Sequence, residues 1–274
     1  MNEVLWAAQV GYPPLATLQW LPLAGALLLL IMREQDLALI LGRVFAVGEL
    51  VVAIDLYARI DVSTSVLQFA ERVDQLAYHA AADGVSVLFI LLTALLGALL
   101  SFYGMARQQI PPVRLLSVLL LTEASLMTML TTMNLLWFAA ASAVQLALVG
   151  YLLWRWASSP EESLALSRFL QYQLFGWCLF VAGAVVLAWS HVDVVGGHWS
   201  FDLFEMLQTP QIGKYQSAAF YLLFYGLAVR TPLFPLHGWL PNSAGYGLIA
   251  VGPVLLLGVK VGIYGMLRFL LPLT

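Results

Sequence analysis

Three ionisable side chains lie inside stretches of the chain that are otherwise apolar: Glu123, Arg230 and Lys260. An ionised side chain at the centre of a membrane helix costs roughly 2.5–3.5 kcal/mol, so such residues pair with one another, contact water or act on an ion. Burial can remove the proton from an ammonium group, whereas a guanidinium stays charged. We therefore expect Lys260 to release and rebind a proton, and Arg230 to act as a fixed positive charge.

Two roles are open for Glu123. It is either a proton carrier or the structural partner of Arg230. Gln145 adds a neutral polar group at mid-depth of a neighbouring apolar stretch, where it could substitute for a carboxylate. We predict a proton path that includes Lys260, Glu123 and Arg230, with Gln145 as the polar substitute.

The segment 37–57 is unusually polar for one that crosses a bilayer, since it contains Arg43, Glu49 and Asp55. Charged residues near a membrane boundary commonly pair with one another. The two carboxylates have Arg43 and Arg59 as neighbours in the sequence. We expect both to form local ion pairs with these arginines.

Two prolines interrupt the apolar segment 228–241. Pro232 and Pro235 each remove a backbone donor and clash with the preceding turn, so we predict a helix break there. Irregular backbone at membrane depth is tolerated where it is buried in protein or lines a hydrated cavity, and broken helices are common in ion transporters. His237 stands just beyond the break and can titrate near neutral pH, so it is either a packing residue or a proton relay, and we include it with Lys260, Glu123 and Arg230 in the predicted proton path.

Composition defines the class of protein. Of 274 residues, 62% are hydrophobic and only 10% are charged, whereas soluble domains carry about 25% charged residues. This excludes a soluble enzyme, and a net charge of −3 leaves no basic surface for a nucleic acid. Because each crossing needs about 20 apolar residues, we predict an all-α, polytopic membrane helix bundle of about eight transmembrane helices, the seventh broken by prolines. The predicted spans are 15–32, 37–57, 84–104, 112–131, 134–155, 169–190, 215–240 and 247–270, in a single transmembrane domain of residues 1–274.

Basic residues beside the short connections predict the orientation. On one side lie Arg33, Arg107, Arg114, Arg155 and Arg168, and on the other lie Arg59, Arg72 and Lys214. The positive-inside rule makes the first side cytoplasmic and places both termini outside, in what we expect to be a bacterial inner membrane. The longer outer connections, 58–83 and 191–214, are expected to be solvated loops.

The segment 230–241 reads RTPLFPLHGWLP, and the segment 257–269 reads LGVKVGIYGMLRF. Together they resemble the antiporter-like membrane subunits of NADH:quinone oxidoreductase, which share ancestry with Mrp-type cation/proton antiporters. The segments 83–86 and 134–138 are similar to weaker marks of the same family. The resemblance extends from about residue 80 to Thr274.

This resemblance implies a proton route near the membrane midplane, through a glutamate on the fifth helix, a lysine on the seventh and a lysine on the eighth. Lys260 matches the last of these positions. Arg230 stands at the seventh-helix position, and Ala143 at the fifth-helix position when counted from Asn134 without gaps. The run 242–244, Asn-Ser-Ala, replaces an Asp-Ala-His-like run. Family subunits are also nearly twice as long, so residues 1–274 would correspond to their N-terminal bundle.

The first functional hypothesis is a membrane subunit of a multi-subunit proton-translocating complex, contributing part of a proton path. Its partners would be other membrane subunits, one supplying the second helix bundle, and a soluble redox subunit. Alternatively, the chain serves proton or cation flux in an inorganic-carbon (bicarbonate or CO2) uptake complex with a carbonic-anhydrase-like partner, or is a non-conducting structural subunit. We find no metal-ligand spacing and no cofactor motif. We therefore expect no metal, no cofactor and no bond chemistry in this chain, even if it belongs to an NADH:quinone oxidoreductase-like translocase.

Overall fold

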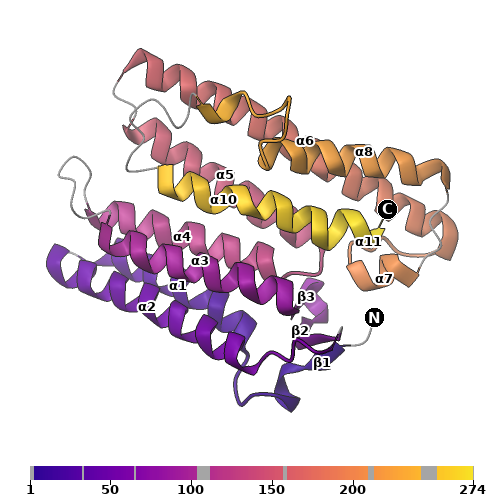
Figure 1. Ribbon diagram of the computed structural model, residues 1–274, viewed down its shortest axis with the longest axis horizontal. Helices are drawn as coiled ribbons and strands as arrows, with labels where there is room; N and C mark the ends of the chain where they lie inside the picture. Colours follow the sequence, from indigo (N-terminus) through magenta and orange to yellow (C-terminus); the bar gives the residue numbers. More distant parts are fainter. Residues whose placement is uncertain are drawn as a thin grey trace.

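The computed structural model of the chain describes residues 3–32, 34–64, 66–103, 112–156, 159–208, 213–241 and 252–273. Long helices run side by side along the long axis of the molecule (Figure 1). The helices are α1 Pro14–Ile31, α2 Gln35–Arg59, α3 Gly84–Tyr103, α4 Pro112–Thr131, α5 Leu135–Trp156, α6 Pro160–Val195, α7 Leu203–Gln208, α8 Gly213–Arg230, α10 Gly252–Gly265, the π-helical turn η5 Met266–Leu270 and α11 Leu271–Leu273.

Five of the described helices are long and apolar enough to cross a membrane, which confirms the predicted class of protein. The predicted span 112–131 coincides with α4. Helix α6 begins at Pro160 rather than at residue 169, because proline suits the first helical position and the polar first turns do not register as membrane sequence. The first residues of the eighth predicted span, 247–251, lie outside the described residues.

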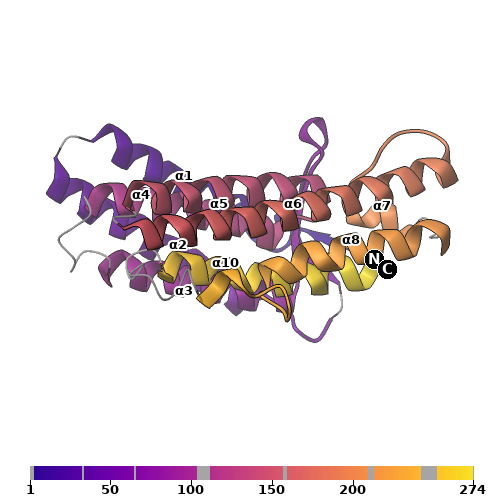
Figure 2. The ribbon, with the colours of Figure 1, turned by 90° about the horizontal axis from the view of Figure 1, so that it is seen from above.

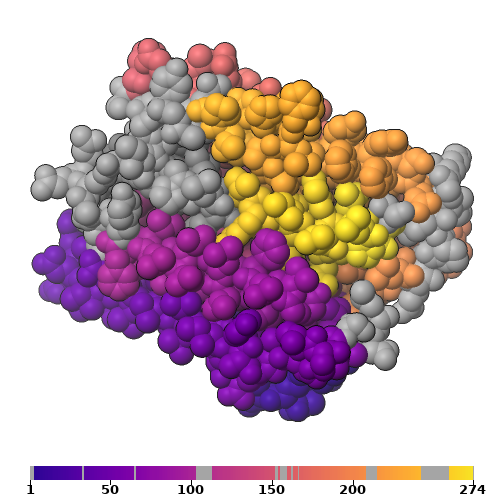
Figure 3. All heavy atoms as spheres, viewed as in Figure 1, coloured from indigo at the N-terminus to yellow at the C-terminus, as the bar shows by residue number. Residues whose placement is uncertain are grey.

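Helix α10 has a central place in the bundle. It packs against α3 and α4 and also against α5 and α8. Figure 3 shows the yellow C-terminal segment at the surface between the magenta α3 and the orange α8. A polar side chain on α10 can therefore reach residues from both the first four helices and the later ones.

Helices α6 and α8 approach each other closely, and glycines make this possible. A Cβ atom at Gly226 would lie 2.7 Å from the backbone nitrogen of Phe180 and 2.8 Å from the carbonyl oxygen of Gly176. Small residues allow this kind of approach between membrane helices. The close packing fixes the C-terminal end of α8, where Arg230 lies.

The connection 58–83 forms regular structure, so the prediction of a solvated loop is wrong there, whereas in the connection 191–214 residues 193–199 are exposed as expected. Strands β1 Glu3–Leu5, β2 Leu67–Val73 and β3 Tyr78–Ala82 form a sheet in the order β1-β2-β3. Strand β1 is parallel to β2, and β2 is antiparallel to β3. Small and apolar residues on β2 and β3 are buried against α1 and α4. Both chain ends lie at the end of the bundle that carries this sheet (Figures 1 and 2).

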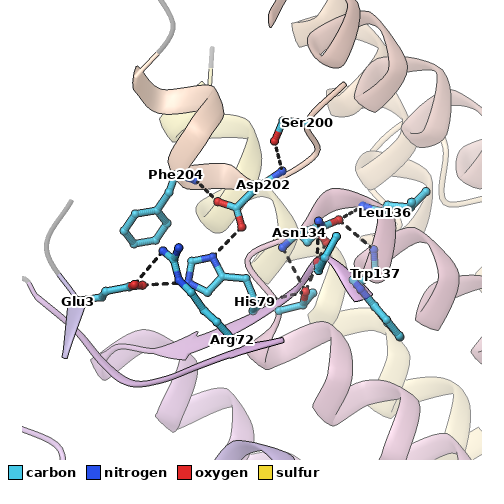
Figure 4. A network of polar contacts seen from close by, with 11 residues as sticks. Glu3, Arg72, His79, Asn134, Leu136, Trp137, Ser200, Asp202 and Phe204 are labelled. Atoms are coloured by element: carbon cyan, nitrogen blue, oxygen red, sulfur yellow. Dashed lines mark hydrogen bonds and ion pairs between the residues drawn. The ribbon is translucent and has the colours of Figure 1, made fainter. Parts of the chain in front are cut away.

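Polar contacts join this sheet to the starts of α5 and α7 (Figure 4). The side-chain oxygen of Asn134 accepts the N–H of Leu136 at 2.8 Å, and its amide nitrogen donates to the carbonyl of Ala77 at 3.1 Å. The Asp202 carboxylate accepts the N–H of Phe204 at 2.8 Å. Side-chain oxygens at these positions satisfy helix N–H groups that have no partner within the helix. Asn134 and Asp202 therefore determine where α5 and α7 begin.

Candidate functional site

Glu123 lies in the interior of the bundle and is fully buried. Its helix, α4, packs against α1, α2, α3, α5 and α10, so few of its side chains reach the surface. The Glu123 carboxyl group lies against Gly97 of α3, where a Cβ atom would overlap its Oε1. The glycine on α3 thus makes the space that the carboxyl group occupies.

Glu49 of α2 is also fully buried, and its carboxyl group interacts with that of Glu123. None of their four carboxyl oxygens makes a hydrogen bond with another residue in the described part of the chain. The expected pairing is confirmed for Asp55, whose carboxylate lies 2.8 Å from Nε of Arg59. It is wrong for Glu49, and Arg43 lies instead over the ring of Phe102.

The role of Glu49 was missed in the sequence, although a signal was present. A carboxylate that pairs locally on a helix needs a basic residue three or four positions away. Those positions around Glu49 hold Phe45, Ala46, Val52 and Ala53. A mid-span carboxylate without such a neighbour must find its partner on another helix.

Lys260 of α10 completes this group. Its Nζ atom is buried and has no hydrogen-bond partner among the described residues. It is close enough to Glu123 for their charges to interact. The structure therefore brings together Glu49, Glu123 and Lys260 from α2, α4 and α10, with an apolar surrounding that strengthens their electrostatic interaction.

Arg230 lies apart from this group, at the last residue of α8, and is 9% exposed. Its Nη1 donates a hydrogen bond to Oγ of Ser142 on α5. Two small cavities touch its side chain, one lined also by Gln145 and both by Gln173 of α6. Each leaves about 20 Å³ for the centre of a water molecule, which is room for one water.

Gln145 lines the same cavity as Arg230, and its role as a polar substitute stays a prediction. Ala143, the position reached by counting from Asn134 without gaps, is not among the described residues that line either cavity. Gln173 was not predicted. Its polar side chain in an apolar span was the available signal, but the sequence does not reveal that it shares a cavity with Arg230.

The predicted helix break is present. Helix α8 ends at Arg230, and residues 231–238 form turns. The Trp239 indole Nε1 donates to the carbonyl of Val229 at 2.9 Å, and Oγ1 of Thr231 donates to the carbonyl of Leu227 at 2.9 Å. The Leu227 carbonyl also keeps its helical partner, the N–H of Thr231, and the Ala228 carbonyl, which Pro232 cannot bond, accepts the N–H of Leu233 at 3.0 Å. The carbonyl groups at the end of α8 are therefore satisfied although the helix stops there.

His237 belongs to neither group. It is exposed beside the break, with its ring centroid 5.8 Å from that of Phe234. Pro235 is exposed in the same turn. The run 242–244 that follows lies outside the described residues.

An ion pair between the buried Arg268 and the partly exposed Asp83 holds α10 in place beyond Lys260. Nη1 of Arg268 lies 3.1 Å from Oδ2 of Asp83, and its Nη2 donates to Oγ of Ser86 at 2.7 Å. The Tyr264 hydroxyl accepts from Nε of Arg268 at 3.2 Å and donates to the carbonyl of Leu130 at 2.8 Å. These contacts fix α10 against α3 and α4, and they therefore position Lys260 relative to Glu123.

Comparison with known proteins identifies the family. Residues 132–274 match the family described as NADH:quinone oxidoreductase/Mrp antiporter, TM. Subunit M of the NADH-quinone oxidoreductase of Rickettsia prowazekii is 29% identical over 93% of this chain. The match covers 53% of that relative, so the chain spans about half the length of the curated relatives it matches.

Solved structures share the fold. A chain of respiratory complex I from Thermus thermophilus superimposes with a TM-score of 0.78, at 24% identity, over 94% of this chain and 53% of its own length. A chain of the Mrp complex from Dietzia sp. DQ12-45-1b gives a TM-score of 0.77 at 19% identity, over 93% of this chain and 47% of its own length. At these identities the likeness concerns the fold alone. The family model covers more than half of the chain, and the protein therefore belongs to the NADH:quinone oxidoreductase/Mrp antiporter transmembrane family.

Proposed function

We propose that this chain is an antiporter-like membrane subunit of a multi-subunit proton-translocating complex, and that it contributes part of a proton path. One observation carries the proposal: Glu123 and Lys260 lie inside the bundle close enough for their charges to interact, and Nζ of Lys260 has no hydrogen-bond partner among the described residues. Ionisable groups that are retained inside a membrane protein without a structural partner are expected to be functional. Family membership and the relatives named as NADH-quinone oxidoreductase subunits support the same function.

In this proposal a proton moves between Glu123 and Lys260. A neutral Lys260 accepts a proton through the lone pair of Nζ, and its positive charge then stabilises the ionised Glu123. When the proton returns, both groups become neutral, so the exchange changes no net charge inside the bundle. Arg230 stays charged throughout and, with the single waters that its cavities can hold, maintains a hydrated spot beside the helix break.

The test uses two substitutions at Lys260 in the complete complex in its native membrane. Lys260→Ala removes the proton carrier, and Lys260→Arg keeps the charge but cannot release the proton at neutral pH. We expect both to lower the protons moved per turnover of the driving reaction, by on the order of tenfold or more. Assembly is checked by native gel electrophoresis. Arg59→Ala, at an exposed residue of α2, is the matched control and should leave coupling unchanged.

A non-conducting structural subunit is the second candidate. It is favoured by Arg230, which is bound to Ser142 and faces the neutral Gln145, so no pair of groups there can exchange a proton at neutral pH. This candidate predicts normal coupling in both Lys260 variants. Normal coupling in well-assembled variants would therefore refute the proton path.

We propose a bacterial inner membrane with both termini outside, and other membrane subunits as neighbours. Purification in mild detergent followed by mass spectrometry of the co-purifying proteins tests the partners. NADH-oxidising or quinone-site subunits would identify a redox-driven complex. A chain that purifies alone would contradict the proposed complex.

A further inference from the structure

We propose that Glu49 and Glu123 form a carboxyl pair that holds one proton between them, which makes Glu49 a second proton-binding group beside Lys260. The role of this pair in proton transport rests on the proposed function. The presence of the shared proton does not depend on the proposed function, because it follows from the burial and contacts of the two carboxyl groups. The ligand that the pair binds is a proton.

Burial is the first argument. Glu49 and Glu123 are both 0% exposed, and their carboxyl groups interact across the α2–α4 contact. Two carboxylates this close in an apolar interior cannot both be ionised, because neither water nor a hydrogen-bond donor offsets their repulsion. One proton between them removes a negative charge and supplies the missing donor. Carboxyl pairs that share a proton in this way are known in aspartic proteases.

Charge balance is the second argument. Helices α1 and α3 contain no charged residue, and Arg43 of α2 lies over the ring of Phe102. The charged group facing the pair from α10 is Lys260. A pair with one proton carries a charge of −1, which a protonated Lys260 balances. With both carboxyl groups ionised, the cluster would keep an uncompensated negative charge inside the bundle.

The space around the pair is the third argument. The carboxyl group of Glu123 occupies the room left by Gly97 of α3, in contact with its backbone. This places the group between α2, α3 and α4 and limits its movement. Any side chain larger than that of glycine would displace the carboxyl group from its present position relative to Glu49.

The pair extends the proton path by one carrier. A proton that reaches the pair while Lys260 is neutral leaves both carboxyl groups protonated. One O–H bond of the pair then breaks and an N–H bond forms at Nζ, which leaves the singly protonated pair beside an ammonium group. Each transfer moves one proton and no electrons, and the pair can accept its next proton from the side of α2.

Infrared difference spectroscopy of the intact complex tests the shared proton directly. Spectra of the wild type minus those of each variant isolate the carbonyl stretch of a protonated carboxyl group from all unchanged residues. We expect Glu49→Gln to remove one protonated-carboxyl band, because the remaining Glu123 ionises against Lys260. We expect Glu123→Gln to keep one such band, shifted because Glu49 now faces an amide instead of a carboxylate. Glu34→Gln, at an exposed position before α2, should cause neither change.

Several outcomes would overturn the inference. The first is that both variants lose only bands of ionised carboxylates and no band of a protonated carboxyl group. The second is that the protonated-carboxyl band survives Glu49→Gln, and the third is that this band is unshifted in Glu123→Gln. Gly97→Ala offers an independent check that keeps both carboxyl groups, and it should shift the band by displacing Glu123. Sodium ions added to the wild-type complex should leave the protonated-carboxyl band in place. If sodium replaced the proton and converted this band to carboxylate bands, the site would not be a proton site.

The two proposals can fail separately. A band that behaves as expected, together with normal coupling in the Lys260 variants, would refute the proton path and leave the shared proton intact. Lost coupling in the Lys260 variants without the expected band would refute the shared proton alone.

Discussion

The Nδ1 atom of His79 lies 2.6 Å from Oδ2 of Asp202, although the two residues are 123 positions apart in the sequence. The other ring nitrogen, Nε2, lies 2.9 Å from a carboxylate oxygen of Glu3. The imidazole is only 4% exposed. His79 thus links β1, β3 and the segment before α7 through the two carboxylates that lie at its ring nitrogens (Figure 4).

This link should make the end of the bundle that carries the sheet sensitive to acid. Burial alone would raise the pKa of Asp202, but the hydrogen bond and charge of His79, with further contributions from the Phe204 N–H and Arg72, lower it below its usual value. The stabilisation is present above the unfolded pKa, near 4, and is lost as the pH falls through the lowered folded pKa. We expect hydrogen exchange at residues 79–82 and 200–206 to accelerate in that range.

Substitution of His79 separates this effect from general acid unfolding. His79→Gln cannot bridge both carboxylates as the ring does, and the loss of at least one of the two buried contacts should cost on the order of 1–3 kcal/mol of unfolding free energy. The acid transition should then begin at a higher pH, because the pKa of Asp202 returns toward its usual value. His198→Gln is the matched control, since that side chain is 77% exposed. An identical acid transition in both variants would contradict the role given to His79.

Glu71 should give the opposite pH dependence. Its two carboxylate oxygens accept the N–H groups of Leu15 and Ala16, each at 2.9 Å, at the first turn of α1. Burial raises the pKa of Glu71 to about 7, although these two hydrogen bonds oppose the shift. Between the unfolded pKa and this value the folded protein binds more protons than the unfolded one, so the unfolding free energy should fall as the pH rises to about 7.

The measurement is thermal unfolding of the purified protein from about pH 5 to about pH 8, across the range where a carboxyl group with this raised pKa titrates. Glu71→Gln should remove part of the decrease in stability, since an amide does not titrate in this range. Glu34→Gln, at an exposed residue, should leave the pH dependence unchanged. An unaltered pH dependence in Glu71→Gln would show that Glu71 does not titrate here.

The sequence was sufficient to predict the helices and the break between them. Hydropathy over a window of a helix length reports burial in lipid directly, so α4 coincides with its predicted span. Pro232 acts locally, through its missing N–H group, and the end of α8 could be predicted for that reason. The burial of Glu123 follows from its position in the middle of an apolar span.

Contacts between distant segments could not be predicted in the same way. Glu49 finds its partner on another helix, and His79 finds Asp202 across the chain. The sequence of a polar connection, considered without the rest of the fold, predicts a solvated loop. The buried hydrogen bonds of such a connection form only after the helices have packed. The same limit applies to Gln173, whose cavity depends on the packing of α5, α6 and α8.

Arg268 should be essential for the position of α10. Arg268→Ala would leave Asp83 without its buried ion-pair partner and remove a donor from Ser86. Asp83 is 32% exposed, so water offsets part of the loss, and we take about 1–3 kcal/mol, the usual cost of removing a hydrogen-bond partner from buried groups. We expect a loss of unfolding free energy of this size in chemical denaturation, and reduced coupling because Lys260 moves. Arg59→Ala, which breaks an exposed pair, should cost less than about 1 kcal/mol. Equal losses in the two variants would contradict a special role for Arg268.

Gly262 should be the position where the packing of α10 against α8 is most sensitive to added volume. A Cβ atom there would meet Oγ1 of Thr231 and lie 2.9 Å from the backbone nitrogen of that residue, at the end of α8. Backbone cannot move aside as a flexible side chain can, so Gly262→Ala should cost about 1–3 kcal/mol by forcing the helices apart. Gly48→Ala is the control, because its Cβ would meet only a side-chain carbon of Leu21, at 3.3 Å. Alanine is the better helix former, so the control should be neutral or slightly stabilising. The measurement is the melting temperature of both variants in detergent. Equal melting temperatures would mean that α10 and α8 tolerate separation, and that their contact does not hold Lys260 in place.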